Sequence, residues 1–364
     1  MSDHPYWLGF SLVPNIGPKR LLRLLQTFGD LKTAWNATEQ DLAYAGLDET
    51  LIHNIQQTRR KLDLDAELGK IQRWKARLLT LFDEEYPPLL KQVDDAPPVL
   101  YIRGKLLPSD QLALGIVGTR KATQYGKDVA QDLSRRLAQH DVTIVSGLAQ
   151  GIDSAAHQGA INGGGRTIAV LGCGVDIIYP REHRELALQI IEHGAIVSEF
   201  PIGMQPIANN FPRRNRTLSG MTLGVLVVEA PEGSGALITA STAAEQGREV
   251  FAVPGNIYSP MSRGTNHLIQ DGAKLVSRVE DILDELQVTY AQQQTRTQTA
   301  EVVPDNPTEA LLLEYLQADP IHVDDLARLC KLPITDVTST LTILELKGLA
   351  QNVGLMQYSR TFDP

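Results

Sequence analysis

The sequence predicts an α/β chain in which a Rossmann-like, doubly wound parallel sheet lies between a small helical N-terminal domain and a C-terminal winged-helix domain. Two observations predict the sheet. Seven short apolar runs lie between residues 112 and 277, and most lack the polar alternation of a half-exposed strand. Glycine-rich turns and helical stretches separate these runs. Continuous apolar strands alternating with helices are typical of a parallel sheet covered on both faces.

The N-terminal segment, which we place at residues 1–85, has the pattern of paired short helices. A loop from Pro14 to Pro18 precedes an amphipathic helical stretch, and residues 45–56 repeat the order of apolar residue, turn and helix. This pattern is typical of helix-hairpin-helix or SAM-like domains, whose hairpins can offer backbone amides to phosphate. Asn15 stands where such hairpins often have glycine. We therefore favour a small domain that serves packing within the protein over one that binds phosphate.

The central domain, residues 86–286, opens with a proline-rich bridge that carries a short strand from Val99 to Arg103. We expect seven further strands in the runs LALGIVG, VTIVSG, RTIAVLG, AIVSEF, LGVLVVEA, EVFAVPG and KLVS. Residues 287–306 are rich in Gln and Thr, and we expect a flexible linker there. Residues 307–364 read as three helices and a hairpin, the pattern of a winged helix.

The third of these C-terminal helices, residues 334–348, would be the recognition helix. It carries Lys347 against Asp336 and Glu345, whereas a helix that reads duplex DNA normally presents a basic face. We therefore favour a protein-contact or regulatory role for the winged helix.

Composition narrows the class of protein. The chain has 364 residues, 43% of them hydrophobic, and a net charge of -9, which suits a cytoplasmic protein of two or three domains. No basic start with an apolar run indicates a signal peptide, and no apolar segment approaches the roughly 20 residues of a membrane span. Cys173 and Cys330 lie too far apart in sequence to form a metal or redox motif.

Open parallel sheets bind ligands beyond the carboxyl ends of their strands, so the turns after the strands are the candidate site. Glycines let backbone amides approach a ligand at these turns, at positions Gly118, Gly147, Gly151, Gly172, Gly174, Gly233 and Gly235. The turns contain neither a dinucleotide fingerprint nor a P-loop, and we expect no cofactor. His157, Ser146 and Ser234 lack the partners of a catalytic set, and Asp153 and Glu229 fit a helix start and a strand end.

One stretch, residues 209–220, concentrates positive charge. Arg213, Arg214 and Arg216 are the only charged residues between Phe200 and Val228. Pro212 favours a helix start there, and cations in a first helical turn oppose the helix macrodipole. We therefore expect these arginines to lack acidic partners and to bind an anion.

Phe211, directly before the arginines, fits either a core position or a stacking platform for a nucleobase. Arg120, in the first turn, could converge on the same crevice.

Several motifs together resemble one known family. GTRKATQYG, SGLAQGIDSAAH, AVLGCGVDIIYP, FPRRNRTLSG, VVEAPEGSGALITA and FAVPGN followed by GTNHLIQDGA resemble, in this order, the DNA processing protein A family (DprA/Smf). The resemblance implies a single-stranded DNA-binding protein without enzymatic activity. It also implies that the protein dimerises, protects incoming DNA and loads the RecA recombinase in natural transformation, with a single-strand-binding protein as a further partner.

The resemblance also implies DNA-binding residues. The G-x-R turn gives Gly118 and Arg120, and the F-P-x-R-N-R element gives Phe211, Arg214, Asn215 and Arg216. We add the neighbouring turn and helix-start positions Gly147, Gly151, Asn210, Ser234 and Gly235. Arg213 falls on the variable position, and Ala208 stands where relatives often carry lysine, which implies a weaker grip on phosphate.

Two alternatives stay open. PEGSGALITA is similar to a turn of cytokinin-activating phosphoribohydrolases, which would make the chain a nucleotide-binding enzyme. Thr239 stands at the position of that family's glutamate, which disfavours this alternative. A protein-interaction scaffold with a vestigial pocket is the other alternative, and the retained arginines disfavour it.

Overall fold

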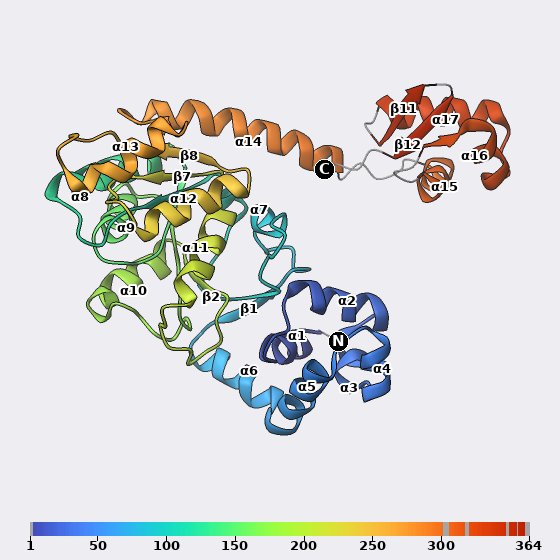
Figure 1. The fold of residues 1–364 in the computed structure, drawn as a ribbon, viewed down its shortest axis with the longest axis horizontal. Helices are drawn as coiled ribbons and strands as arrows, with labels where there is room; N and C mark the ends of the chain where they lie inside the picture. Colours follow the sequence, from blue (N-terminus) through green and yellow to red (C-terminus); the bar gives the residue numbers. More distant parts are fainter. Residues whose placement is uncertain (1–2, 301–305, 317–319, 347–348, 355, 361–364) are drawn as a thin grey trace. The chain divides into compact units, whose positions relative to one another are not determined.

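The computed structural model describes residues 3–300, 306–316, 320–346, 349–354 and 356–360 (Figure 1). The chain forms two compact units that divide between Leu286 and Gln287. The first unit holds the helical N-terminal region and the large sheet, and the second holds the winged helix.

The N-terminal region consists of six helices, α1 (His4–Ser11), α2 (Pro18–Phe28), α3 (Leu31–Asn36), α4 (Glu39–Tyr44), α5 (Glu49–Lys61) and α6 (Leu64–Arg73). Their ends follow capping rules. Asp48 accepts a hydrogen bond from the Leu51 amide at the start of α5, and Arg59, Arg60 and Lys61 lie in its last turn, where cations favour the macrodipole. In the hairpin between α1 and α2, Asn15 adopts a φ of 65°, a left-handed conformation that asparagine tolerates well.

Nine strands form the large sheet, β1 (Arg77–Thr80), β2 (Val99–Gly104), β3 (Ala113–Val117), β4 (Thr143–Ser146), β5 (Thr167–Val170), β6 (Ala195–Ser198), β7 (Gly224–Val227), β8 (Glu249–Ala252) and β9 (Lys274–Leu275). Their order across the sheet is β1-β2-β6-β5-β4-β3-β7-β8-β9. The strands from β3 to β9 pair in parallel, and β2 pairs antiparallel with both β1 and β6. The predicted α/β fold with a Rossmann-like parallel sheet is confirmed.

Helices connect the strands of this sheet: α7 (Pro88–Lys91), η1 (Pro108–Gln111), α8 (Gln124–Ala138), α9 (Ile152–Asn162), η2 (Arg181–His183), α10 (Arg184–His193), α11 (Asn210–Gly220), α12 (Gly235–Glu245), η3 (Pro260–Ser262) and α13 (Arg263–Gln270). Helix α14 (Glu280–Ala300) follows the last strand, β9. Two buried clusters cover the two sheet faces. One joins the sheet to α10 and to the N-terminal helices, and the other joins it to α11 and α12. Neighbouring residues of β5 alternate between them, with Ala169 in the first and Ile168 and Val170 in the second.

Two segments differ from the sequence analysis. β1 was not expected, and it places residues 77–80 in the sheet, inside the segment that the sequence assigned to the helical domain. Helix α14 runs from Glu280 to Ala300, through most of the expected linker at 287–306. Glycine and proline are absent between Gln287 and Val303, so no local signal ends the helix there. Residues 301–305 of that segment lie outside the described residues.

The second unit contains α15 (Pro307–Tyr315), β10 (Ile321–His322), α16 (Val323–Cys330), α17 (Ile334–Leu346), β11 (Ala350–Gly354) and β12 (Gln357–Arg360). The three helices pack around one apolar cluster, which includes Leu312, Leu326 and Leu341, and β12 pairs with β10 and β11. The expected winged helix is confirmed. Lys347 and Gly348, which the sequence placed at the end of the recognition helix, lie outside the described residues.

Candidate nucleic-acid interface

The expected site residues lie at the edge of the sheet where strand order reverses. Successive strands run outward from β3 through β4, β5 and β6 on one side, and through β7, β8 and β9 on the other. A crevice at such a switch point is the usual ligand site of open α/β sheets. Gly118 and Arg120 follow β3, Gly147 and Gly151 follow β4, Ser234 and Gly235 follow β7, and α11 carries Asn210, Phe211, Arg214, Asn215 and Arg216.

Arg214 is buried in this edge, with only 6% of its surface exposed. One guanidinium nitrogen, Nη1, donates to the carbonyl oxygens of Gly147 at 2.5 Å and Val170 at 2.9 Å, and Nε donates to Oδ1 of Asn215 at 2.9 Å. Burial lowers the pKa of the guanidinium, and the nearby Asp153 carboxylate opposes that lowering. Arg214 therefore joins the ends of β4 and β5 to α11, which is a structural role.

Two buried carboxylates hold turns at this edge of the sheet. Asp153, in the first turn of α9, accepts hydrogen bonds from the amides of Gly147 at 3.1 Å and Ala149 at 3.3 Å. Burial raises its pKa, and Arg214 opposes this rise. Glu229, just after β7, accepts from the amide and the hydroxyl of Thr123 at 2.9 and 2.6 Å. Both carboxylates organise the backbone, in accord with the helix-start and strand-end positions that the sequence indicated.

Phe211 is half-buried and lies among cations. The guanidinium carbon of Arg120 lies 5.2 Å from the ring centroid, and that of Arg214 lies 5.8 Å away. Arg120 is exposed, and within the described part of the chain it has no carboxylate at ion-pair distance. The Tyr179 ring lies 6.3 Å from that of Phe211. An exposed cation thus stands beside an aromatic ring at the switch point.

Two of the three clustered arginines have acidic partners, and the expectation that they have none was wrong. Nη2 of Arg213 lies 2.6 Å from Glu199, and Nη1 of Arg216 lies 2.7 Å from Asp95. Glu199 stands one residue before the acid-free window, and Asp95 is 121 residues away from its partner in the chain. A scan of sequence neighbours therefore could not find the second pair.

The glycines of the turns serve packing more than ligand approach. A Cβ atom at Gly118 would overlap Ile152, one at Gly147 would overlap the Arg214 guanidinium, and one at Gly151, whose φ is 83°, would overlap a carbonyl of the first turn. At Gly235, an added Cβ would meet nothing within 4 Å. Only the last of these four positions leaves open space.

The remaining expected polar residues also bond within the protein. The side-chain amide of Asn210 donates to the Gly172 carbonyl at 3.0 Å, and that of Asn215 donates to the Gly235 carbonyl at 3.5 Å. Ser234 caps α12 by accepting from the Ala236 amide at 3.3 Å. These residues position α11 and α12 relative to the turns.

Candidate catalytic groups are engaged in the same way. Ser146 donates to the Ile116 carbonyl at 2.6 Å, and the His157 ring lies 2.7 Å from the Thr167 hydroxyl, with burial lowering the histidine pKa to about 3. Thr239 is buried, and its hydroxyl donates to a backbone carbonyl of its own helix. A buried hydroxyl thus occupies the position of the phosphoribohydrolase glutamate.

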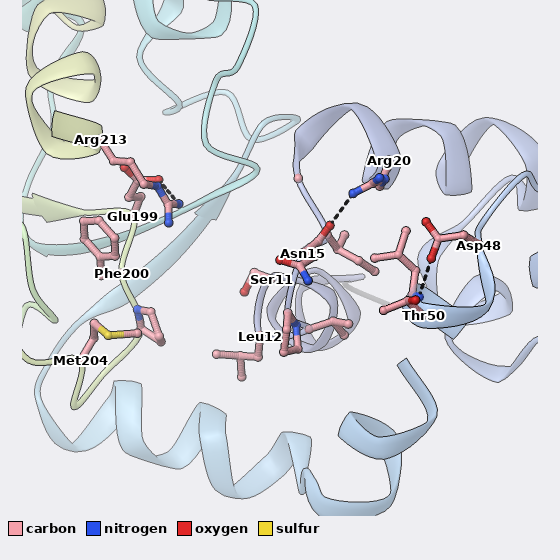
Figure 2. Close-up of a pocket in the computed structure, with 16 residues that line it drawn as sticks. Ser11, Leu12, Asn15, Arg20, Asp48, Thr50, Glu199, Phe200, Met204 and Arg213 are labelled. Atoms are coloured by element: carbon pink, nitrogen blue, oxygen red, sulfur yellow. Dashed lines mark hydrogen bonds and ion pairs between the residues drawn. The ribbon is translucent and has the colours of Figure 1, made fainter. Parts of the chain in front are cut away.

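A cleft of about 910 Å³ lies between α11 and the hairpin that joins α1 to α2 (Figure 2). Arg213 and Glu199 form one wall, and Arg20, which donates to the Asn15 carbonyl at 2.8 Å, belongs to the other, together with Asp48. The charges along the cleft therefore balance. Among the clustered arginines, Arg213 faces this cleft, whereas Arg214 points into the edge of the sheet.

Tyr179 is the neighbour of the site that the sequence analysis did not single out. It lies in the glycine-rich turn after β5, and 45% of its surface is exposed. The available signal was its place in the loop after β5, because the loops after parallel strands lie at the ligand edge of the sheet.

Comparisons with known proteins agree with this geometry. The family model "DNA recombination-mediator protein A" matches residues 77–287, and the model "DprA winged helix domain" matches residues 296–354. Protein Smf from Synechocystis sp. is 36% identical over 396 aligned positions, which cover 99% of each chain.

Two solved structures are also similar. DNA processing protein A from Streptococcus pneumoniae has a TM-score of 0.67 and 35% identity, over 78% of this chain and 98% of that chain. The protein of the same name from Helicobacter pylori, solved in work on its single-stranded DNA binding mode, has a TM-score of 0.53 and 30% identity, over 58% of this chain and 95% of that chain. Within the described residues, no helix is both long and apolar enough to span a membrane.

Proposed function

Because the chain belongs to the DNA recombination-mediator protein A family, we propose that it binds single-stranded DNA at the switch point of its sheet and loads RecA onto that strand. The observation that carries the proposal is the exposed guanidinium of Arg120, which has no carboxylate at ion-pair distance among the described residues, beside the half-buried ring of Phe211. The binding of single strands by the Helicobacter pylori relative supports it.

The chemistry of this pair suits a single strand. A guanidinium neutralises a backbone phosphate, and an aromatic ring stacks on a base that no complementary strand covers. Each neutralised phosphate adds about 0.7 to the salt slope of single-strand binding. Because Arg213 and Arg216 already pair with carboxylates, they release fewer counterions, and we expect a shallow slope.

A site with so few contacts binds weakly by itself. Dimerisation would place two such sites on one strand, and the second would bind at a high effective concentration. We propose that the protein acts in the cytoplasm as a homodimer, without catalysis, during recombination of incoming DNA. The single-strand-binding protein on that DNA would be its other partner.

The test uses the full-length chain and a fluorescein-labelled oligo-dT in a salt series. Arg120→Gln removes the exposed cation, and Arg60→Gln, which changes an exposed arginine of α5, is the matched control. We expect the unchanged protein to prefer single strand over duplex, and Arg120→Gln to weaken binding and lower the salt slope by about 0.7.

Equal binding of single strand and duplex, or an unchanged slope in Arg120→Gln, would contradict the proposal. Protein that binds the strand is then added to RecA and to DNA coated with single-strand-binding protein. RecA loading predicts faster filament assembly than RecA shows alone. If no strand binds, small nucleotides are the next ligands to test, as the phosphoribohydrolase alternative requires.

A further inference from the structure

The ring of Tyr179 is an open aromatic surface at the proposed strand site. It lies in the turn after β5, is 45% exposed, and is tilted by 46° to the Phe211 ring at a centroid distance of 6.3 Å. Its hydroxyl makes no hydrogen bond within the part of the chain that the structure describes. The side chain is therefore neither a core residue nor a participant in the local hydrogen-bond network.

The turn on both sides of this ring is anchored. Three residues before it, the Asp176 carboxylate accepts from the Gly203 amide at 2.9 and 3.1 Å. Four residues after it, the His183 ring bonds to the Leu148 carbonyl at 2.9 Å. Because the turn is anchored before binding, stacking on this ring requires little further ordering of the backbone.

Phe211, by contrast, has little free surface. The guanidinium groups of Arg120 and Arg214 lie against its ring, and a Cβ atom built at Gly172 would lie 3.1 Å from the ring edge. A base that reaches Phe211 must share the ring with Arg120. The Tyr179 ring, at the side of Phe211, is the less crowded of the two.

The spacing of the two rings excludes a clamp around one base. Stacked bases lie about 3.4 Å apart, so a base between two parallel rings needs about 6.8 Å between them. The rings lie closer than this and are tilted. The arrangement suits separate contacts with successive bases.

Charges beside Tyr179 are compatible with a strand. Arg181, two residues further on, is exposed and has no carboxylate at ion-pair distance among the described residues. The Glu182 carboxylate next to it accepts a hydrogen bond from the Gln150 side chain and is a negative charge on the same turn. Arg181 is therefore the group of this turn that a phosphate would contact.

We propose that Tyr179 is a base-stacking residue that extends the strand site to a second nucleotide beyond Phe211. The inference rests on the proposed function, since it requires that a single strand occupies this edge. A surface for another protein is the competing explanation of an exposed tyrosine, and the test below separates the two.

The test measures binding of full-length protein to an oligo-dT that carries one 2-aminopurine, whose emission falls when an aromatic ring stacks on it. Tyr179→Leu removes the ring, Tyr179→Phe retains it, and Tyr44→Leu removes a tyrosine that is 89% exposed on α4, away from the site. We expect Tyr179→Leu to bind about tenfold more weakly and to lose quenching. Tyr179→Phe and Tyr44→Leu should bind within about twofold of the unchanged protein, because neither removes a stacking ring.

The salt slope separates stacking from charge. Tyr179→Leu should keep the slope of the unchanged protein, because no phosphate contact is lost, whereas Arg120→Gln should lower it by about 0.7. If Tyr179→Leu does not fold, Tyr179→Trp replaces it, and its added tryptophan emission should fall on binding oligo-dT.

Unchanged affinity and quenching in folded Tyr179→Leu, or unchanged emission in Tyr179→Trp, would overturn the inference while the proposed function stands. Failure of the unchanged protein to bind any single strand would overturn both.

Discussion

Replacing Arg214 with alanine should destabilise the first unit strongly. The substitution removes a buried cation that bonds to the carbonyls of Gly147 and Val170, and it leaves Arg120 as the remaining positive neighbour of the buried Asp153 carboxylate. Breaking a buried ion pair costs about 3–5 kcal/mol, and Arg214 and Asp153 interact electrostatically without an ion-pair contact among the described residues. The Gly147 and Ala149 amides still bond to Asp153, which favours the lower end of that range.

Urea unfolding followed by tryptophan emission measures this loss. All three tryptophans lie in the first 85 residues, and Trp7 and Trp35 belong to the buried cluster that contains Leu148, next to Gly147. With a slope near 3 kcal/mol per molar urea, the midpoint should fall by about 1 M or more. Arg216→Ala is the matched control, because its exposed ion pair with Asp95 is worth less than about 1 kcal/mol.

Equal midpoints for the two variants would refute the structural role of Arg214. A second substitution sharpens the test. Asp153→Asn should recover part of the stability that Arg214→Ala loses, because it removes a buried negative charge that has lost one of its two positive neighbours. Loss of DNA binding in Arg214→Ala would then report a distorted site, and Arg120→Gln is the better probe of phosphate contact.

Three further predictions concern neighbouring groups. Glu199→Gln frees Arg213 from its ion pair, so oligo-dT anisotropy should show tighter binding and a salt slope steeper by about 0.7; weaker binding would count against it. Burial lowers the pKa of His157 to about 3 in the folded protein, against about 6.5 in the unfolded chain. As the pH falls below about 6.5, the unfolded chain therefore binds a proton that the folded protein does not, and the free energy of unfolding falls by up to about 1.4 kcal/mol per pH unit. Urea midpoints between pH 7 and pH 5 should show this slope, and a His157→Leu variant with the same slope would contradict it. Gly126→Ala places a Cβ against the Glu229 carboxylate and should lower the free energy of unfolding in urea by about 1–3 kcal/mol. Gly235→Ala, where the added Cβ meets open space, should lower it by less than half of that, and equal losses would disprove the packing argument.

The parallel strands could be predicted because burial on both faces leaves a continuous apolar run in the sequence. β1 could not, because it is only four residues long, it begins soon after α6, and its pairing with β2 is a tertiary contact. The helix through 287–300 was missed for a related reason. Glutamine and threonine suggest a linker by composition, yet nothing in that stretch stops a helix that begins at Glu280.

The sequence predicted that the expected site residues lie in the turns after the strands, but it did not predict most of their contacts within the protein. The rule that ligands bind beyond the carboxyl ends of strands brought Arg120 and Phe211 to one place. Burial of Arg214 and the ion pair between Arg216 and Asp95 depend on residues far apart in the chain. Close packing at Gly147 likewise depends on a side chain that folding brings from α11.

Leu148 links the N-terminal helices to the strand-end turns of the sheet, so the two parts of the chain are not independent in evolution. It is a fully buried residue with a φ of 58°, a conformation that costs a non-glycine residue about 1–2 kcal/mol. Its side chain belongs to the same apolar cluster as Trp7 and Phe10 of α1, while its neighbour Gly147 holds Arg214. Deleting the N-terminal helices would remove part of the apolar cluster that contains this leucine. A shortened descendant would then need a new apolar cover for the part of the cluster that remains.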